Sequence, residues 1–339
     1  MRILLIKPNY NDATDVTPPL GTGYLAAVAR QGGHEVRLLD NRIRSQSHSH
    51  YIATLKSWRP DIVGFSAVTY EKELVKKLVC EARDLLPEVK TVIGGPIAWA
   101  DPADALLEGM IDYAVQGEGE TAFRKLLAKI DDGQRGDDLP SVATWNESGE
   151  VRINPPEEFI QKVDELPFPA WDLFDMPSYH RSPRMGYVFK YKEYFPIFSS
   201  RGCPYGCIYC HKIFGRRYRA RSPENVLREI ETLVQQYRIR EIQIVDDTFN
   251  VDMERAKRIF EGIIERNMKI GICFPSGLRG DLLNEEFIDL MARAGTFRVS
   301  VAVETASPKI QRLIKKNVDL EKLREVIRLM VKKRMITNF

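Results

Sequence analysis

The sequence predicts an α/β protein with two domains, each built on a parallel sheet. Three observations lead to this prediction. Short apolar runs alternate with amphipathic segments at the start of the chain and again after residue 196. The strand candidates are continuously apolar, as in strands covered by helices on both faces. The length of 339 residues, 44% of them hydrophobic, is enough to form two such cores.

The first domain is predicted to span residues 1–135 and to be a doubly wound, Rossmann-like sheet. Five apolar runs, each followed by a turn signal and a helical pattern, supply its strands. The predicted strands are 2–8, 35–40, 61–67, 90–95 and 112–117, and the predicted helices are 22–32, 48–58, 71–86, 102–108 and 119–131. The loops after the strands should gather at the carboxyl edge of the sheet, where such sheets bind ligands.

Residues 136–195 interrupt this alternation. The stretch SVATWNESGEVRINPP predicts a hairpin that turns at 147–149. The following ELPFPAWDLFDMPSYH is rich in proline and aromatic residues and has neither a helical nor a strand period. We therefore predict a hairpin followed by a linker that is too apolar to be disordered.

The second domain is predicted to span residues 196–339 and to contain about four βα units. Its predicted strands are 196–202, 241–247, 269–276 and 297–304, and its predicted helices are 222–237, 252–267, 284–294 and 319–333. The sequence stops at RMITNF, which has the pattern of an opening fifth strand. We therefore expect a series of units that is truncated at its C-terminus, as in a fragment of a longer protein.

Composition and cysteine usage exclude several classes of protein. Five cysteines, three of them within eight residues, are too few and too clustered for a secreted disulfide framework, so a cytoplasmic location is predicted. No apolar stretch approaches the roughly 20 residues of a membrane span. A net charge of +3, from 50 basic and 47 acidic residues, gives no reason to expect a nucleic-acid partner.

The spacing Cys203-x3-Cys207-x2-Cys210 is the strongest chemical signal in the chain. A zinc site needs four ligands, and the nearest fourth candidate, His211, is adjacent to Cys210 and badly placed to complete a tetrahedron. A redox pair would leave Cys203 unexplained. Three thiolates without a fourth suit a four-iron, four-sulfur cluster with one iron open to a small molecule. The spacing favours this cluster over the zinc and redox alternatives, and the other cysteines, Cys80 and Cys273, are predicted to be buried apolar residues.

This motif, with Tyr209 just before the last cysteine and after the first strand of a βα series, resembles the radical S-adenosylmethionine (radical SAM) superfamily. The resemblance implies a partial (β/α)6 barrel in which Cys203, Cys207 and Cys210 bind a [4Fe–4S] cluster. The open iron would chelate the amino and carboxylate groups of S-adenosylmethionine. One electron would then cleave a C–S bond to give a 5′-deoxyadenosyl radical, which abstracts hydrogen from a substrate.

The same resemblance assigns further residues to the binding of S-adenosylmethionine. Tyr209 would lie on the adenine side, and Asp246 or Asp247 would meet the methionine amino group. Glu304 would meet the ribose or the methionyl group, and Arg279 would pair with the carboxylate. The structural alternatives are helix capping for Asp246 and Glu304, and a surface ion pair for Arg279.

The first domain resembles the cobalamin-binding domain that precedes many radical SAM barrels. The matching stretches are PPLGTGYLAAVARQGGHEV (18–36), IVGFSAVT (62–69), VIGGPIAWADP (92–102) and DYAVQGEGE (112–120). The resemblance implies that Ser66 meets the nucleotide tail of the cofactor and that the glycines let the backbone approach it. The residues that it assigns to cobalamin are Ser66, Thr69, Gly94, Gly95, Gly117, Glu118 and Gly119. The alternatives are that Glu118 caps the following helix, and that the domain is a scaffold that has lost cobalamin.

One feature departs from the cobalamin domains that supply a lower axial histidine. Those domains carry an Asp-x-His-x-x-Gly pattern after the first strand, whereas residues 7–23 contain no histidine. His34 precedes the second strand and falls at the wrong edge of the predicted sheet. We therefore expect cobalamin without a histidine lower ligand.

These features predict an anaerobic, cobalamin-dependent radical SAM enzyme that methylates an unactivated carbon. The alternatives are a cyclase or ring-rearranging enzyme of the porphyrin-cyclase type, or a non-catalytic cobalamin- or cluster-binding module if the protein ends at Phe339. The implied partners are a small-molecule substrate and an electron donor, which would be a reductase, a flavodoxin or a ferredoxin.

Overall fold

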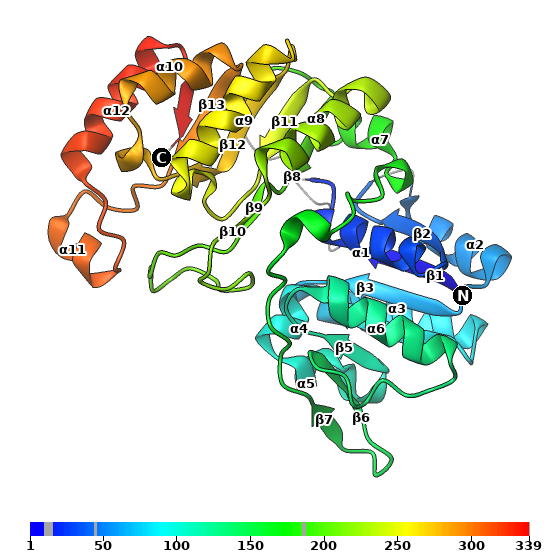
Figure 1. Cartoon of the computed structure of the whole chain (residues 1–339). Coiled ribbons are helices and arrows are strands. Elements are labelled where there is room, and N and C mark those ends of the chain that lie inside the picture. The colour runs from blue at the N-terminus through cyan, green and yellow to red at the C-terminus, as the bar shows by residue number, and fades with distance from the viewer. Residues whose placement is uncertain (10–15, 44–45, 185–187, 339) are drawn as a thin grey trace. The chain divides into compact units, whose positions relative to one another are not determined.

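The computed structural model describes residues 1–9, 16–43, 46–184 and 188–338, and it divides into two compact units (Figure 1). The first unit comprises Met1–Ile160 and Leu166–Met185, and the second comprises Gln161–Glu165 and Gly186–Phe339. Among the described residues, no helix combines the length and the apolar composition that crossing a membrane requires.

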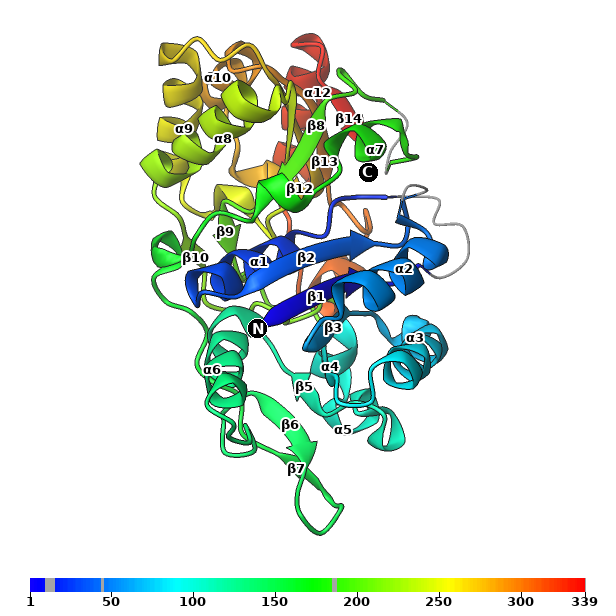
Figure 2. The same cartoon turned by 90° about the vertical axis from the view of Figure 1, so that its right-hand side faces the viewer.

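The first unit contains a seven-stranded sheet with the order β2-β1-β3-β4-β5-β6-β7. Its parallel strands are β1 (Arg2–Lys7), β2 (Glu35–Asp40), β3 (Ile62–Ser66), β4 (Lys90–Gly94) and β5 (Tyr113–Val115). The antiparallel strands are β6 (Val142–Trp145) and β7 (Val151–Ile153), which continue the sheet beyond β5 (Figure 2). The predicted parallel α/β architecture of this part of the chain is confirmed.

Helices cover both faces of this sheet. They are α1 (Leu20–Gln31), α2 (His48–Trp58), α3 (Lys72–Leu85), α4 (Pro96–Ala100), α5 (Pro102–Ala105) and α6 (Gly119–Asp131). Alternate residues of β1 point to opposite faces, so Leu4 belongs to the core that contains α2 and α3, and Ile3 to the core that contains α1 and α6. This two-sided burial explains why the strands are continuously apolar.

The segment predicted as a hairpin and linker is divided between the two units. The hairpin β6–β7 forms as predicted and belongs to the first sheet. Residues 166–184 contain the short helix α7 (Met176–Arg181) and also pack on the first unit. The amide of Ala170 donates to the carbonyl of Gly23 (3.0 Å), and the buried Tyr179 hydroxyl donates to Asp40 Oδ2 (2.8 Å).

The second unit contains five parallel strands that neighbour one another in chain order, as in a (β/α) barrel series. They are β8 (Tyr194–Ile197), β11 (Glu241–Ile244), β12 (Gly271–Leu278), β13 (Thr296–Val301) and β14 (Ile336–Asn338). The helices α8 (Pro223–Tyr237), α9 (Met253–Glu265), α10 (Glu285–Arg293) and α12 (Leu320–Lys332) lie on one side of them (Figure 1). The fifth strand predicted from RMITNF is β14, whereas the short helix α11 (Pro308–Leu313) was not predicted.

Candidate cofactor sites

The cysteine motif lies in a loop that is closed at its base. Strands β9 (Ser200–Arg201) and β10 (Arg219–Ala220) pair antiparallel and bring the two ends of the loop together. Gly202, the first loop residue, has φ +80°, and a Cβ there would collide with the carbonyl oxygens of Arg217 and Phe214. Only glycine fits at position 202, because both the left-handed backbone and the close approach of the two carbonyl oxygens exclude a side chain.

The three cysteines of this loop are close enough to affect the ionisation of one another. Cys207 is buried, whereas Cys203 and Cys210 are half-buried. The amide of Cys210 donates to the carbonyl of Cys207 (3.4 Å). Burial raises the pKa of the Cys210 thiol, and its neighbours Cys203, Asp247 and Cys207 raise it further because they carry negative charge when ionised. A cationic centre in the loop would reverse this penalty on the thiolates.

The arrangement of the thiols fits a cluster better than a single metal ion. The loop supplies three cysteines within eight residues, whereas a structural zinc ion needs four ligands. A zinc ion requires its ligands to meet at one point, whereas each cysteine of a [4Fe–4S] cluster binds a different iron. Three cysteines spread along one loop therefore suit the cluster.

Asp247 and Thr248, just after β11, lie against the cysteine loop. Asp247 Oδ2 accepts a hydrogen bond from the amide of Gly202 (3.2 Å), and its Oδ1 is 3.7 Å from His211 Nε2. Thr248 Oγ1 is 3.2 Å from Cys203 Sγ. Burial raises the pKa of the Asp247 carboxyl, and His211 opposes this shift. Asp247 is thus the carboxylate of the Asp246–Asp247 pair that faces the loop.

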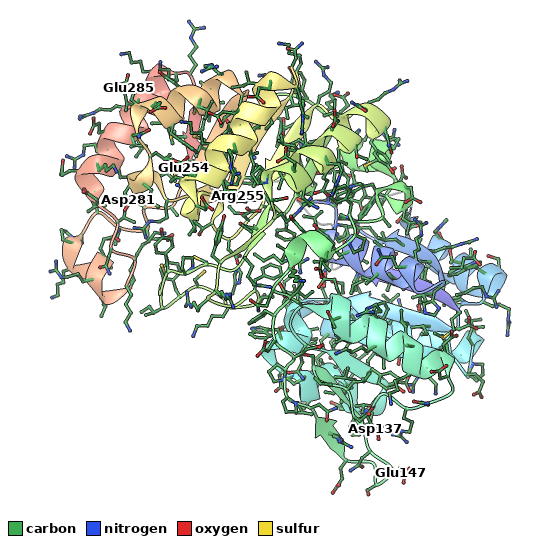
Figure 3. All side chains as sticks on the ribbon, in the orientation of Figure 1. Asp137, Glu147, Glu254, Arg255, Asp281 and Glu285 are labelled. Atoms are coloured by element: carbon green, nitrogen blue, oxygen red, sulfur yellow. The ribbon has the colours of Figure 1, made fainter. Side chains whose placement is uncertain are left out.

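Asp246 is engaged within the protein. It is buried, and it accepts hydrogen bonds from the Ser199 amide (2.6 Å), the Ser199 hydroxyl (2.5 Å) and the Ser200 hydroxyl (2.6 Å). The predicted alternative of helix capping is wrong for Asp246, because Asp252 caps α9. Arg255 of α9, labelled in Figure 3, donates to the carbonyl of Ser199 (2.5 Å) and strengthens the same junction.

Arg279 follows β12 and is also committed to protein partners. It forms a bidentate ion pair with Asp281, with Nε–Oδ1 at 2.9 Å and Nη2–Oδ2 at 2.8 Å; Asp281 is labelled in Figure 3. Its Nη1 donates to the carbonyl of Lys316 (3.1 Å), and its guanidinium lies 4.2 Å from the centre of the Tyr205 ring. The ion-pair alternative therefore describes this contact, although both side chains are largely buried rather than on the surface.

Tyr209 and Glu304 are brought together by Lys316, which no pattern in the sequence marks. Lys316 Nζ donates to Glu304 Oε1 (3.0 Å) and to the Tyr209 hydroxyl (3.2 Å). The hydrogen bond from Lys316 lowers the pKa of Glu304, and burial raises the pKa of Tyr209. The capping alternative for Glu304 is wrong, because Ser307 caps α11. Only the fold separates Lys316 from the other lysines of its basic stretch, so the sequence held no signal for it.

The residues assigned to cobalamin lie at the carboxyl ends of three neighbouring strands. Ser66 ends β3 and is paired in register with Gly94 of β4. Gly95 has φ +87°, and a Cβ there would lie 3.0 Å from the carbonyl oxygen of Ala67. Thr69 is exposed and begins a short 3-10 turn.

The third of these strands, β5, leads to Gly117, Glu118 and Gly119. Gly117 has φ +68°, and Gly119 begins α6. Glu118 stands at the N-cap position, but its side chain does not cap the helix; its Oε2 accepts a hydrogen bond from the amide of Ile160 (2.8 Å). The helix-capping alternative for Glu118 is therefore wrong.

Buried polar atoms at this edge fit an amide-rich ligand such as a corrin. In the part of the chain that the structure describes, four such atoms at or near the carboxyl ends of β1, β2 and β5 have no hydrogen-bond partner. They are Asn9 Oδ1, Thr22 Oγ1, Asn41 Oδ1 and Gln116 Nε2. Buried polar atoms are nearly always paired in folded proteins, so these four lack a partner of the kind that a bound ligand would supply. A corrin ring carries peripheral amides that can both donate and accept hydrogen bonds.

The histidine and cysteine predictions can also be placed. His34 precedes β2, and its Nδ1 is 3.4 Å from the amino group of Met1, at the edge opposite the proposed cofactor site. Residues 10–15 of the histidine-free loop lie outside the described residues. Cys273 is buried as predicted and accepts a hydrogen bond from Arg298 Nε (3.0 Å). The prediction for Cys80 is wrong, because it is exposed on α3.

Comparisons with known proteins agree with these two sites. The family model for the B12 binding domain matches residues 6–127, and the model for the Radical SAM superfamily matches residues 197–339. The chain is 33% identical to an uncharacterized methyltransferase (PH0819) of Pyrococcus horikoshii, over 94% of this chain and 68% of the relative. It is 28% identical to the cytidylyl-2-hydroxyethylphosphonate methyltransferase of Streptomyces wedmorensis, over 96% and 70% of the two chains.

A third relative is named as a cyclase rather than as a methyltransferase. The chain is 27% identical to the anaerobic magnesium-protoporphyrin IX monomethyl ester cyclase of Rubrivivax gelatinosus, over 100% of this chain and 61% of the relative. The chain thus spans between 61% and 70% of the length of these three proteins.

Solved structures share the fold. The radical SAM methyltransferase TsrM from Kitasatospora setae matches with a TM-score of 0.80 and 22% identity, over 99% of this chain and 66% of that one. The cobalamin-dependent radical enzyme OxsB matches with a TM-score of 0.82 and 21% identity, over 99% and 48%. The chain belongs to the cobalamin-dependent radical SAM enzymes, a family that combines a B12 binding domain with a radical SAM domain and uses cobalamin, a [4Fe–4S] cluster and S-adenosylmethionine.

Proposed function

We propose that the chain carries the catalytic part of a methyltransferase that acts on an unactivated carbon atom of a small molecule. The observation that carries this proposal is the loop of Cys203, Cys207 and Cys210, with the Tyr209–Glu304 pair beside it, in a chain that also has a B12 binding domain. The methyltransferase names of two relatives support it. When bound, the cluster supplies the electron that cleaves S-adenosylmethionine to a 5′-deoxyadenosyl radical, and cobalamin carries the methyl group.

The residues of the second unit then divide into two groups. Cys203, Cys207 and Cys210 ligate the cluster, while Tyr209, Asp247 and Glu304 contact S-adenosylmethionine. Asp247 suits the methionine amino group, because an ammonium next to it would offset the cost of burying its charge. Asp246 and Arg279 act as positioning residues, because their side chains are committed to Ser199, Ser200 and Asp281.

The first unit holds cobalamin at the carboxyl edge of its sheet. The contacting residues are Ser66, Thr69, Gly94, Gly95, Gly117, Glu118 and Gly119, and no histidine of this chain is the lower ligand. The glycines let the backbone approach the cofactor, while the unpaired polar atoms of Asn9, Thr22, Asn41 and Gln116 bind its amides.

Cyclisation of a porphyrin side chain is the second candidate. The relative named as a magnesium-protoporphyrin cyclase is 27% identical and matches over the full length of this chain. The proposed roles of the three cysteines and of Glu304 are the same for either reaction, so the two candidates differ in the substrate. Both require an external electron donor such as a flavodoxin, a ferredoxin or a reductase.

The test is anaerobic reconstitution of the chain with iron, sulfide and hydroxocobalamin, followed by metal analysis. We expect about four irons and one cobalt per chain. With S-adenosylmethionine and dithionite, the protein should release 5′-deoxyadenosine. Cobalt that does not co-elute with the protein would overturn the cobalamin assignment, and zinc in place of iron would overturn the cluster assignment.

A pair of cysteine variants makes the test specific. Cys207→Ala should abolish the release of 5′-deoxyadenosine, because a cluster with two cysteine ligands is not retained. Cys80→Ala should leave the release unchanged, because Cys80 is exposed on a helix of the other unit. Full activity in Cys207→Ala would contradict the proposed site.

A further inference from the structure

Glu304 occupies a strained backbone conformation that its surroundings fix. Its φ is +62°, in the left-handed region that non-glycine residues seldom adopt. The carbonyl groups on either side of it, those of Val303 and Thr305, both accept hydrogen bonds from Gln311 Nε2 at 2.8 Å. Such strain persists only where neighbouring groups hold it, and it is concentrated at functional sites.

Lys316 holds the side chain of the same residue. Its ammonium donates to Glu304 Oε1 (3.0 Å) and to the Tyr209 hydroxyl (3.2 Å). The Lys316 side chain is 8% exposed, whereas that of Glu304 is 39% exposed. The Glu304 carboxylate is therefore open to a ligand, whereas Lys316 is nearly enclosed by the protein.

The segment that carries Gln311 and Lys316 also contacts the cysteine loop through its backbone. The amide of Ile208, between Cys207 and Tyr209, donates to the carbonyl of Ile314 (3.1 Å). Residues 308–316 thus join two segments that are far apart in the sequence, the cluster loop and the turn after β13. We name this segment, α11 with the three residues that follow it, the 308–316 clip.

We propose that the 308–316 clip sets the S-adenosylmethionine site, with Lys316 and Gln311 as positioning residues that fix Glu304 and Tyr209 in their binding geometry. This inference rests on the proposed function, because it assumes that Glu304 and Tyr209 contact S-adenosylmethionine. The hydrogen bond from Lys316 holds the Glu304 carboxylate in one orientation. A fixed carboxylate accepts hydrogen bonds from ribose hydroxyls, or attracts an ammonium, without the entropy cost of being ordered on binding.

The test uses Lys316→Met in the full reconstituted chain, with Lys315→Met as its control. Lys315 is exposed on the same turn, so its loss removes the same charge without touching Glu304. In Lys316→Met we expect the KM for S-adenosylmethionine, measured by release of 5′-deoxyadenosine, to rise at least tenfold. The iron content and kcat should stay within twofold of the wild type. Lys315→Met should keep the wild-type KM.

Two further measurements separate positioning from a general structural role. Lys316→Arg retains the positive charge and should recover most of the lost affinity, whereas a protein that is merely destabilised would not be rescued. Binding of S-adenosylmethionine by calorimetry, without reductant, should show the same loss as the KM. An unchanged KM in Lys316→Met would overturn the inference while leaving the proposed function intact. A wild-type chain that releases no 5′-deoxyadenosine would instead overturn the proposed function.

Discussion

Asp246 accepts hydrogen bonds from both the amide and the hydroxyl of Ser199, at 2.6 and 2.5 Å. Together with the bond from Ser200, this buried carboxylate ties the end of β11 to the segment that enters the cysteine loop. An asparagine there would place an amide where an acceptor is required. We expect Asp246→Asn to lower the free energy of unfolding by about 2 kcal/mol, measured by urea denaturation. A stability equal to that of the wild type would show that the junction tolerates the change.

Asp247, the carboxylate next to Asp246, should respond differently to substitution by asparagine. Asp247 has its main protein contacts with the Gly202 amide and His211, and it is the member of the pair that faces the loop. We expect Asp247→Asn to bind the same amount of iron but to raise the KM for S-adenosylmethionine about tenfold, which corresponds to about 1.4 kcal/mol. Asp246→Glu is not a suitable control, because it disturbs the buried junction. If Asp247→Asn retained the wild-type KM, the proposed contact of Asp247 with S-adenosylmethionine would be wrong.

The first residue of the cysteine loop offers a steric prediction. In Gly202→Ala, a Cβ would collide with two carbonyl oxygens and would require a left-handed alanine. We expect the variant to lose more than about 2 kcal/mol of stability and to retain less iron after gel filtration. Gly206→Ala is the matched control for stability, because a Cβ at Gly206 meets no protein atom within 4 Å. Equal stability of the two variants would contradict the steric explanation.

His34 makes the stability of the first unit depend on pH. Burial, together with the nearby amino terminus, lowers the pKa of His34 below its ordinary value of 6.5. The unfolded chain therefore binds a proton at this site more readily than the folded chain does. Stability from this residue is present above its ordinary pKa and is lost as the pH falls. We expect the free energy of unfolding to decrease from about pH 7.5 to about pH 5.5, and to decrease less in His34→Gln. Identical pH profiles for the two proteins would refute this role.

The strands and main helices could be predicted from the sequence because each is marked by its own residues. Continuous apolar runs marked the strands of both sheets, and the hairpin β6–β7 was marked by alternation around Gly149. The short helix α11 was not predicted, because six residues are too few to show a helical period. The packing of residues 166–184 on the first unit depends on tertiary bonds such as that of Tyr179 to Asp40.

In the candidate site, too, some features are marked by the local sequence and others depend on tertiary contacts. The cysteine motif is local, so its spacing predicted a cluster loop. Asp246 and Asp247 are chemically identical neighbours. They have different partners because their side chains point in different directions in the folded chain. Lys316 lies over a hundred residues from Tyr209, and no pattern in one sequence relates the two. Contacts of this kind become visible only when the chain is folded.

The antiparallel hairpin that follows β5 determines which fragments of the first unit keep their sheet edge covered. A fragment that ended at residue 135 would leave β5 as an unprotected edge strand with free backbone donors and acceptors, and would uncover apolar side chains that β6 now covers. Exposed edges of this kind invite intermolecular pairing and aggregation. A fragment that retains β6, β7 and residues 166–184 would keep that edge closed, so insolubility of the shorter piece would reflect a lost neighbour rather than an inability to bind cobalamin.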